Sequence, residues 1–371
     1  MIFYLTDSLR GDSEYLESIR HELHNLAFAA IEGYHYLMGD FDILGDCIKL
    51  FEHEKEVCGL FKNLYDNWYS MPVPKCVSYY MEVVKDNPSI RSEDGKTIAQ
   101  RPITSFGKMS SVMPCQLVCE NDKDCEFYKY VGSWYVRNNK INNASIGFET
   151  DGSGGCEEAK NKVRKHLLKN QFCLCILDSD ISFEGDKVNA KSLECQNAYK
   201  NRDDCNCIIL EVRELENLLP LNYVDEVTAN HHDYQQPLSK DYVRHFNYLR
   251  HSHKHLEILP YFDYKEGIKK TDNYLKSPKY KKFAEICWKQ NPEICTGQTF
   301  KEYEDSVAVG DRLYLPLGRK IHAHTLAHIV DSKLKGTLTE PDLLPYQETE
   351  WNRIGKEIAT WGYSRPTEAV S

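Results

Sequence analysis

The sequence predicts an α/β protein whose central part is a parallel sheet covered by helices. Short apolar runs alternate there with stretches of helical length and periodicity, a pattern typical of β-α-β units. The run at 172–177 is apolar throughout, which suits a strand buried on both faces of a sheet. The chain has 371 residues, 41% hydrophobic and 27% charged, and this length allows two or three domains with full cores.

The N-terminal part, residues 1–110, is predicted to be a helical region that ends in a linker. Apolar residues recur at helical spacing from about position 13 to position 70. Two prolines in the segment 70–76 interrupt this pattern, and residues 86–111 are polar and rich in turn formers. Because apolar stripes at this spacing are usually core, we expect the helices to serve as a scaffold or as the contact of a homo-oligomer.

The middle domain, residues 111–225, contains four predicted strands that each end next to acidic side chains. The strands are the runs 115–119, 145–148, 172–177 and 207–212. Ligands of open parallel sheets bind beyond the carboxyl ends of the strands, so we expect a cluster of carboxylates there. In strand order, the acids are Glu120, Asp122 and Asp124, then Glu149 and Asp151, then Asp178 and Asp180, and finally Glu211, Glu214 and Glu216.

The pair Asp178 and Asp180 follows the third strand as a D-x-D motif. Side chains two residues apart project to the same side while the chain is extended. Mg²⁺ is commonly held by one or two carboxylates together with water and substrate phosphate. The motif, together with Glu120 at the end of the first strand, favours a divalent metal site, and the alternative is that the two aspartates only cap the following segment.

Four segments make the middle domain resemble the TOPRIM domain of topoisomerases, primases and OLD-like nucleases. They are LVCENDKDCEFY, GSGGCEEAKNKV, CILDSDIS and IILEVRELENLLP, in that order. In the family, a Glu ends the first strand, a Gly-rich turn precedes a helix, and D-x-D ends the third strand. The last segment is similar to one found in OLD-like nucleases and in the TOPRIM effectors of the PARIS anti-phage system. The chain departs from the family at Asn121, where glycine is usual, and asparagine tolerates positive φ better than most residues.

The resemblance implies a metal-dependent endonuclease that hydrolyses phosphodiester bonds in DNA or in structured RNA such as tRNA. Glu120, Asp178 and Asp180 would be catalytic, and with Asp124 and Glu216 they would bind two Mg²⁺ or Mn²⁺ ions. Two such ions stabilise the attacking water and the leaving oxygen. The resemblance also implies an anti-phage defence effector under the control of a regulatory ATPase or another trigger partner, since this chain has no ATPase motif of its own.

Two other functions are compatible with the same residues. Phosphatases of the haloacid-dehalogenase type also begin with a hydrophobic strand that ends in D-x-D, but here the motif comes third in strand order, after Glu120. The second alternative is an inactive TOPRIM-fold interaction module, for which Asn121 is the only hint.

The C-terminal part, residues 226–371, is predicted to be basic, rich in histidine and mostly helical. The whole chain has a net charge of −10, yet residues 231–335 contain 18 Lys and Arg against 13 Asp and Glu. Lysines neutralise phosphates and aromatic rings stack on exposed bases. The aromatic-rich lysine segment is therefore a candidate nucleic-acid surface, and a solvated helical face whose aromatic residues enter the core is an equal alternative. The lysines proposed to bind nucleic acid are Lys276, Lys279, Lys281 and Lys282.

Histidine and cysteine offer two further metal hypotheses. His324 and His328 are four residues apart on a predicted helix, a spacing that can chelate a metal, but no third ligand is identifiable and a surface or packing role is favoured. The 14 cysteines include no C-x-x-C pair and often fall in apolar runs, so we expect reduced core thiols, with zinc binding as the competing explanation.

No membrane association is expected. The longest apolar run in the middle of the chain, at 172–177, is far shorter than the roughly 20 residues that span a bilayer. The first residues contain neither a basic leader nor a small-residue cleavage site. We therefore predict a cytoplasmic protein.

Overall fold

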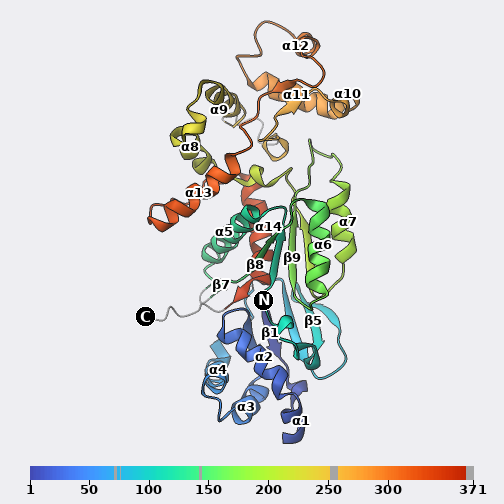
Figure 1. The fold of residues 1–371 in the computed structure, drawn as a ribbon, viewed down its shortest axis with the longest axis vertical. Helices are drawn as coiled ribbons and strands as arrows, with labels where there is room; N and C mark the ends of the chain where they lie inside the picture. The colour runs from blue at the N-terminus through green and yellow to red at the C-terminus, as the bar shows by residue number, and fades with distance from the viewer. Residues whose placement is uncertain (71–72, 76, 142–143, 251–257, 365–371) are drawn as a thin grey trace. The chain divides into compact units, whose positions relative to one another are not determined.

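Two units make up the chain in the computed structural model, and each combines segments that are distant in the sequence. The structure describes residues 1–371 except 71–72, 76, 142–143, 251–257 and 365–371 (Figure 1). The first unit contains Met1–Ile176, Cys195–Ile208 and Trp351–Ser371, and the second contains Leu177–Glu194 and Ile209–Glu350. These units cut across the boundaries predicted near residues 110 and 225.

The N-terminal part of the first unit holds a five-stranded sheet as well as helices. The strand order is β2-β1-β3-β5-β4, with every neighbouring pair parallel except β4 with β5. The strands are β1 (Ile2–Leu5), β2 (Tyr36–Gly39), β3 (Tyr79–Val84), β4 (Ile90–Glu93) and β5 (Lys96–Pro102), and the helices are α1 (Ser13–Ser18), α2 (Arg20–Ile31), α3 (Phe41–Leu50) and α4 (Lys55–Asp66). The prediction of a helical region at 1–110 found the helices but is wrong about the sheet. Strands as short as β1 and β2 are too brief to show an alternating pattern.

The linker predicted at 86–111 is also wrong, because β4 and β5 lie within it. The residues of β5 pair with β3 from Thr97 opposite Tyr79 to Pro102 opposite Val84. Backbone hydrogen bonds to a neighbouring strand hold this polar segment in place. It therefore forms a strand without the apolar run that sequence reasoning looks for.

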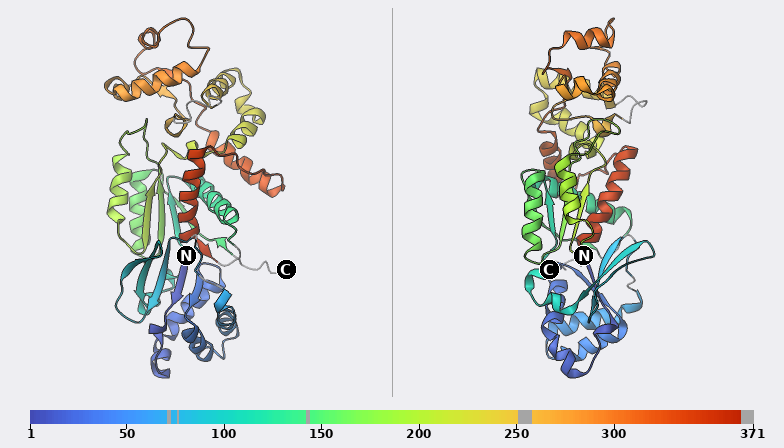
Figure 2. Two further views of the ribbon diagram at one scale, coloured as in Figure 1. Left: turned by 180° about the vertical axis from the view of Figure 1, so that it is seen from behind. Right: turned by 90° about the vertical axis from the view of Figure 1, so that its right-hand side faces the viewer.

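A second sheet, with the order β10-β9-β6-β8, forms the middle of the chain (Figures 1 and 2). Strand β6 pairs in parallel with both β8 and β9, and helices α5 and α6 lie on opposite faces. The bounds are β6 (Gln116–Cys119), β8 (Glu149–Gly152), β9 (Cys173–Leu177), β10 (Cys205–Ile209), α5 (Asp122–Asn138), α6 (Cys156–Leu167) and α7 (Ala190–Tyr199). The prediction of an α/β fold with a parallel sheet and flanking helices is confirmed.

One of the four predicted strands is misplaced. The run at 145–148 contains only the two-residue strand β7 (Ser145–Ile146), which pairs antiparallel with β13 (Tyr363–Ser364) and does not join the main sheet. The neighbour of β6 is instead β8, which itself contains Glu149 and Asp151. Pairing with β6 makes this polar segment a strand, so those two acids do not follow a strand end as predicted.

The helix α14 (Pro345–Trp361) packs its C-terminal part against α5 within the first unit. Trp351 is fully buried, and its ring meets those of Phe127, Tyr130 and Trp134 edge to face at centroid distances of 5.7, 5.9 and 5.3 Å. Further along, a Cβ atom on Gly132 would lie 2.1 Å from Cγ2 of Ile358. Such a close approach of two helices requires a residue without a side chain at this position.

Replacing Trp351 by alanine is expected to destabilise the first unit by about 3–5 kcal/mol, the cost typical of removing a large buried aromatic side chain. Urea unfolding monitored by circular dichroism would show the shift. The control is Tyr69→Ala, since Tyr69 is 89% exposed in the same unit and its loss should change stability by no more than about 0.5 kcal/mol. Equal effects of the two substitutions would contradict the packing described here.

The second unit is built mainly from helices. They are α8 (Leu221–Asn230), α9 (Pro237–Arg250), α10 (Asp272–Lys276), α11 (Pro278–Gln290), α12 (Phe300–Ser306) and α13 (Ile321–Leu334), with a small antiparallel pair of β11 (Ile268–Lys269) and β12 (Arg312–Tyr314). Short 3-10 helices occur in both units, and η5 (Leu215–Leu218) and η6 (His232–Tyr234) carry residues of interest below.

The described cysteines are all free, and all of them except Cys156 and Cys295 are buried. Burial agrees with the prediction of core thiols, but the sulfur atoms of Cys175, Cys195 and Cys207 lie within 4.8 Å of one another, so the zinc alternative stays open. Within the described ranges, no helix combines the length and apolar character needed to cross a bilayer.

Candidate active site

The two predicted site residues of the first unit, Glu120 and Asp124, are both fixed by local contacts. Glu120 directly follows β6 and accepts a hydrogen bond from the thiol of Cys156 at 2.8 Å. Asp124 is buried in the first turn of α5, where it accepts from the backbone N–H of Asn121 at 3.1 Å. The side chain of Asn121 in turn accepts from the N–H of Asp124. This capping box fixes the start of the helix that follows Glu120.

The position where the TOPRIM family usually has glycine needs no glycine in this chain. Asn121 has φ of −148° and lies in the extended region, as the N-cap of α5. Its side chain performs the capping that a glycine could not. The departure from the family pattern therefore causes no backbone strain, and tolerance of positive φ plays no part in it.

The glycine-rich segment after β8 forms a tight turn into α6. Gly154 and Gly155 have φ of 82° and 127°, values that side-chain-bearing residues rarely adopt. At the end of β8, a Cβ atom on Gly152 would lie 2.3 Å from the backbone nitrogen of Asp122. Glycine at these positions is thus explained by backbone geometry.

The D-x-D pair of the second unit does not remain extended as predicted. Strand β9 ends at Leu177, and Asp180 has φ of 55°, in the left-handed region. Asp180 is exposed and accepts a hydrogen bond from the side chain of Asn189. Asp178 is half-buried, and its Oδ1 accepts from the backbone N–H of Leu215 at 3.2 Å. The premise that both carboxylates leave an extended strand is therefore wrong, and Asp178 is the one directed to the 214–216 segment.

Two buried glutamates share one lysine in this segment. The side chains of Glu214 and Glu216 are 7% and 4% exposed, and Lys265 Nζ lies 3.1 and 3.0 Å from one carboxylate oxygen of each. The other oxygen of Glu214, Oε1, is buried without a hydrogen-bond partner among the described residues. The group formed by Asp178, Glu214, Glu216 and Lys265 is called the carboxylate–lysine cluster below.

The local backbone holds the two glutamates in place. Glu214 is the N-cap of η5, and its backbone N–H donates to Oδ1 of Asn217 at 3.0 Å. The amide of Asn217 is fully buried and donates to the carbonyls of Leu259 and Phe262 at 2.6 and 2.9 Å. These hydrogen bonds of Asn217 connect the segment of Glu214 and Glu216 to residues 259–262, which precede Lys265 in the chain.

The electrostatics of the carboxylate–lysine cluster follow from burial and from an imbalance of charge. Burial and the nearby charge of Glu216 raise the pKa of Glu214 to about 8, and burial also raises the pKa of Glu216. Burial opposes the charged form of Lys265, but the charges of Glu216, Glu214 and Asp178 outweigh it and raise the pKa of this lysine. One ammonium group faces three carboxyl groups, so the cluster has capacity for a further cation or for protons.

Next to the cluster, Arg213 and Asp263 form an ion pair at 2.8 Å and line a cavity of about 590 Å³. Basic and hydroxyl side chains, among them Lys269, Lys276 and Ser182, line the same cavity. Acids line the cavity as well, namely Asp186, Asp263 and Glu266, and Glu266 pairs with Lys269 at 2.6 Å. The lining is therefore mixed in charge. Lys276 is the one predicted nucleic-acid contact that lines it.

The remaining predicted nucleic-acid contacts lie on α11. Lys279 and Lys282 are exposed, whereas Lys281 is half-buried, pairs with Glu304 at 3.3 Å and lies 5.7 Å from the centre of the Tyr274 ring. The stacking prediction is wrong for most of the aromatic residues, because their rings are buried in the unit and cannot stack on bases. The buried ones are Tyr264, Tyr274, Phe283 and Trp288.

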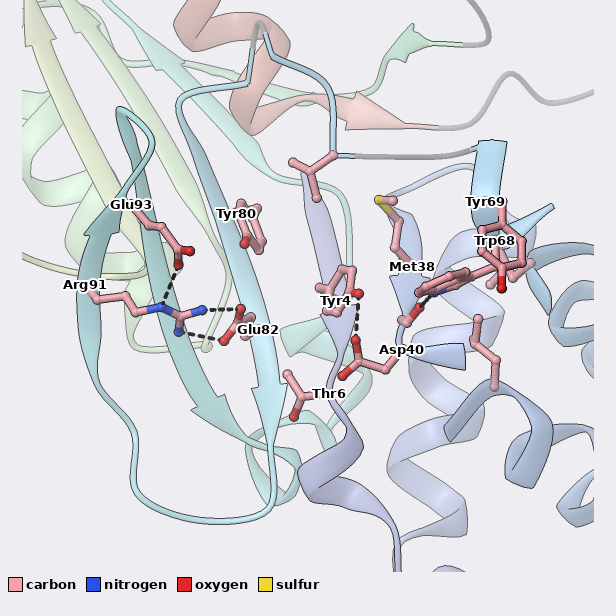
Figure 3. A pocket seen from close by; sticks show the side chains of 14 residues that line it. Tyr4, Thr6, Met38, Asp40, Trp68, Tyr69, Tyr80, Glu82, Arg91 and Glu93 are labelled. Atoms are coloured by element: carbon pink, nitrogen blue, oxygen red, sulfur yellow. Dashed lines mark hydrogen bonds and ion pairs between the residues drawn. The ribbon is translucent and has the colours of Figure 1, made fainter. Parts of the chain in front are cut away.

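The first unit contains a pocket of about 520 Å³ that sequence reasoning missed (Figure 3). Its lining includes Tyr4, Tyr80 and Trp68, and Tyr4 donates a hydrogen bond to Asp40 at 2.8 Å. Arg91 forms paired hydrogen bonds of 2.6 and 2.8 Å with Glu82 at the other end of the pocket. No predicted site residue lines this pocket.

Sequence reasoning also missed Glu214 and Lys265 as partners of Glu216. The E-L-E-N segment contains Glu214, which was noted only as a nearby acid. Lys265 was one of many lysines in a basic segment, and nothing in its spacing distinguished it. Only the fold of the second unit reveals that it is the counter-charge of two buried glutamates.

The chain matches no known family model, and comparisons with curated proteins and with solved structures likewise found no match.

Proposed function

We propose that this protein is a metal-dependent nuclease that hydrolyses phosphodiester bonds in DNA or structured RNA. The observation that carries the proposal is the carboxylate–lysine cluster, in which Glu214 keeps one buried oxygen that has no partner among the residues that the structure describes. Buried charges in proteins are normally paired or bound to metal. Three carboxyl groups on one lysine therefore favour a site that takes up a divalent cation.

The cluster offers oxygen ligands, which are those that Mg²⁺ and Mn²⁺ prefer. Asp178, Glu214 and Glu216 would hold the ion in the second unit. The bound metal would lower the pKa of a water molecule and polarise the phosphate. The roles proposed for Asp180, and for Glu120 and Asp124 of the first unit, rest on the resemblance to TOPRIM nucleases and are tested by substitution.

The side chains of the chain itself would perform the remaining steps. Lys265 is held charged beside the carboxylates, so it is suited to stabilise the negative charge that builds on the phosphate oxygens during in-line attack. The pKa of Glu214 is raised in the metal-free cluster, and binding of a cation would displace its proton, so Glu214 would act as a ligand and the proton for the leaving oxygen would come from water. In the balanced reaction, water adds to phosphorus, the P–O ester bond breaks, and the leaving oxygen receives a proton.

Control by an ATPase or another trigger partner, and a role in anti-phage defence, are proposed from the resemblance alone. The same holds for a homo-oligomer through the N-terminal helices and for a second metal ion.

The test is an assay of the purified chain on plasmid, single-stranded DNA and total tRNA, with Mg²⁺, with Mn²⁺ and with EDTA. We expect cleavage of at least one nucleic acid with either metal and none with EDTA. A phosphomonoester substrate is the control, because turnover of that substrate alone would favour the haloacid-dehalogenase alternative. Calorimetric titration with Mn²⁺ runs in parallel. Absence of both cleavage and Mn²⁺ binding would support the inactive interaction module.

A further inference from the structure

A second group of possible metal ligands lies in the second unit, apart from the carboxylate–lysine cluster. The spacing of His324 and His328 on α13 suggested chelation but left the third ligand unidentified. The fold brings a different pair to His324, namely His231 and Asp233 at the start of η6. One ligand atom from each of these three residues lies within 4.8 Å of the others.

The geometry of the three side chains is compact. The rings of His231 and His324 stack with centroids 3.8 Å apart and an angle of 22° between their planes. Because an imidazole binds an ion in its own ring plane, one of the two rings must rotate out of this stack when the ion binds. The Nε2 atom of His324 lies 3.7 Å from Oδ2 of Asp233. The other ring nitrogen of His324 lies 3.4 Å from the hydroxyl of Tyr234, which is buried. A partner for the second nitrogen is the arrangement that orients metal-binding histidines.

The contacts that an ion would replace are weak. Asp233 pairs with Lys320 at 3.2 Å and with His232 at 2.9 Å, and these two partners are 73% and 82% exposed, so water screens both pairs. The Nδ1 atom of His231 accepts from the backbone N–H of Asp233 at 3.3 Å, a long hydrogen bond. All three side chains are partly accessible, so an ion can enter from solvent.

His328 does not belong to this group. Its Nε2 atom lies 3.1 Å from the carboxylate of Glu226, and its ring packs on Tyr223 at a centroid distance of 5.8 Å. The pair that the helical spacing suggested is thus not the one that the fold assembles.

We propose that His231, Asp233 and His324 bind a divalent first-row transition ion. Two imidazoles and one carboxylate suit ions such as Zn²⁺, Co²⁺, Fe²⁺ and Ni²⁺, and three protein ligands leave positions open for water or an anion. The site differs in chemistry from the carboxylate–lysine cluster, which offers only oxygen ligands. The inference therefore does not depend on the proposed nuclease activity.

The test is titration of the full chain with Co²⁺, followed by visible absorption, in an excess of Mg²⁺ that occupies oxygen-only sites. The Asp178→Ala variant serves as the background, so that loss of the carboxylate–lysine cluster and loss of this site are distinguished. We expect one strong Co²⁺ site per chain, competed by Zn²⁺ and without a sulfur-to-cobalt charge-transfer band. His324→Ala and Asp233→Asn should each weaken binding by about tenfold or more.

Two further variants make the test independent of folding defects. His328→Ala should leave Co²⁺ affinity unchanged, whereas chelation by the helical pair would require it to fall as far as in His324→Ala. Lys320→Ala removes the cation that competes for Asp233 and should raise Co²⁺ affinity, a gain that misfolding cannot produce. No strong Co²⁺ site, a sulfur charge-transfer band, a loss in His328→Ala or a loss in Lys320→Ala would each overturn the proposal.

Discussion

Asp178→Ala is expected to lower metal-dependent cleavage of nucleic acid by about 100-fold or more, because it removes a proposed metal ligand and loss of a group that merely supports such a ligand already costs about 10–100-fold. Asp178 accepts a hydrogen bond from the backbone N–H of Leu215, and its negative charge helps to raise the pKa of Lys265. Without it, the carboxylate–lysine cluster loses one of its three carboxyl groups. Initial rates on the substrate cleaved best, measured over a range of Mn²⁺ concentrations, give the effect.

The matched control for this prediction is Glu184→Ala, an exposed acid in the same segment of the second unit. It removes the same charge and should leave cleavage within about twofold of the parent, as expected for a surface substitution without partners in the cluster. Parent-like rates in Asp178→Ala would reject the proposed site. Glu120→Gln and Asp180→Asn, assayed in the same way, test the catalytic roles that the TOPRIM resemblance implies for those residues.

Lys265→Met is expected to destabilise the second unit by about 3–5 kcal/mol above pH 8, where Glu214 is ionised in the parent, the cost typical of removing one partner from a buried ion pair. Methionine replaces the aliphatic stem of the lysine but not its charge. Glu214 and Glu216 then remain buried beside each other without a counter-charge. Thermal unfolding of parent and variant would show the difference.

The size of this effect should depend on pH in a defined direction. Burial raises the pKa of Glu214 to about 8, above the value of about 4.3 for an unfolded glutamate. Lys265 lowers the pKa of Glu214 against this effect of burial, so its loss raises that pKa further. The folded variant then holds its proton to a higher pH than the folded parent, and the cost of the substitution grows as pH rises. The cost of Lys265→Met should be smallest near pH 5 and largest above pH 8.

Added Mn²⁺ offers a separate check of the same variant. If the cluster binds metal, an ion replaces the missing ammonium group, and Mn²⁺ should restore much of the lost melting temperature. Lys269→Met is the control, because Lys269 forms a surface pair with Glu266 and should cost no more than about 1 kcal/mol. A pH-independent loss in Lys265→Met, with no response to Mn²⁺, would contradict the account of the cluster.

The features that sequence reasoning found are those encoded over a few neighbouring residues. The apolar run at 172–177 matches β9 (Cys173–Leu177), and the stretch of helical periodicity after the first predicted strand forms α5 (Asp122–Asn138). Continuous apolar character and helical periodicity are local signals, so they need no knowledge of the rest of the chain. The α/β class was predicted from their alternation.

The features that sequence reasoning missed depend on pairing between distant segments. Strand β8 is polar and is a strand because it pairs with β6, and β5 is held in the same way beside β3. The five-stranded N-terminal sheet was not predicted, because helical periodicity was the only strong local pattern in that region and strand pairing with distant segments cannot be read from it.

The sequence by itself determined that this chain is an α/β protein with carboxylates after its strands and histidines four residues apart on a helix. Only the tertiary structure decided which of these groups meet. It placed Lys265 between Glu214 and Glu216, and it paired His324 with His231 and Asp233 instead of with His328. The physical reason is that the periodicity of apolar residues and helix capping depend on residues that are close in the sequence. Ion pairs and sets of metal ligands form between side chains that only the folded backbone brings together.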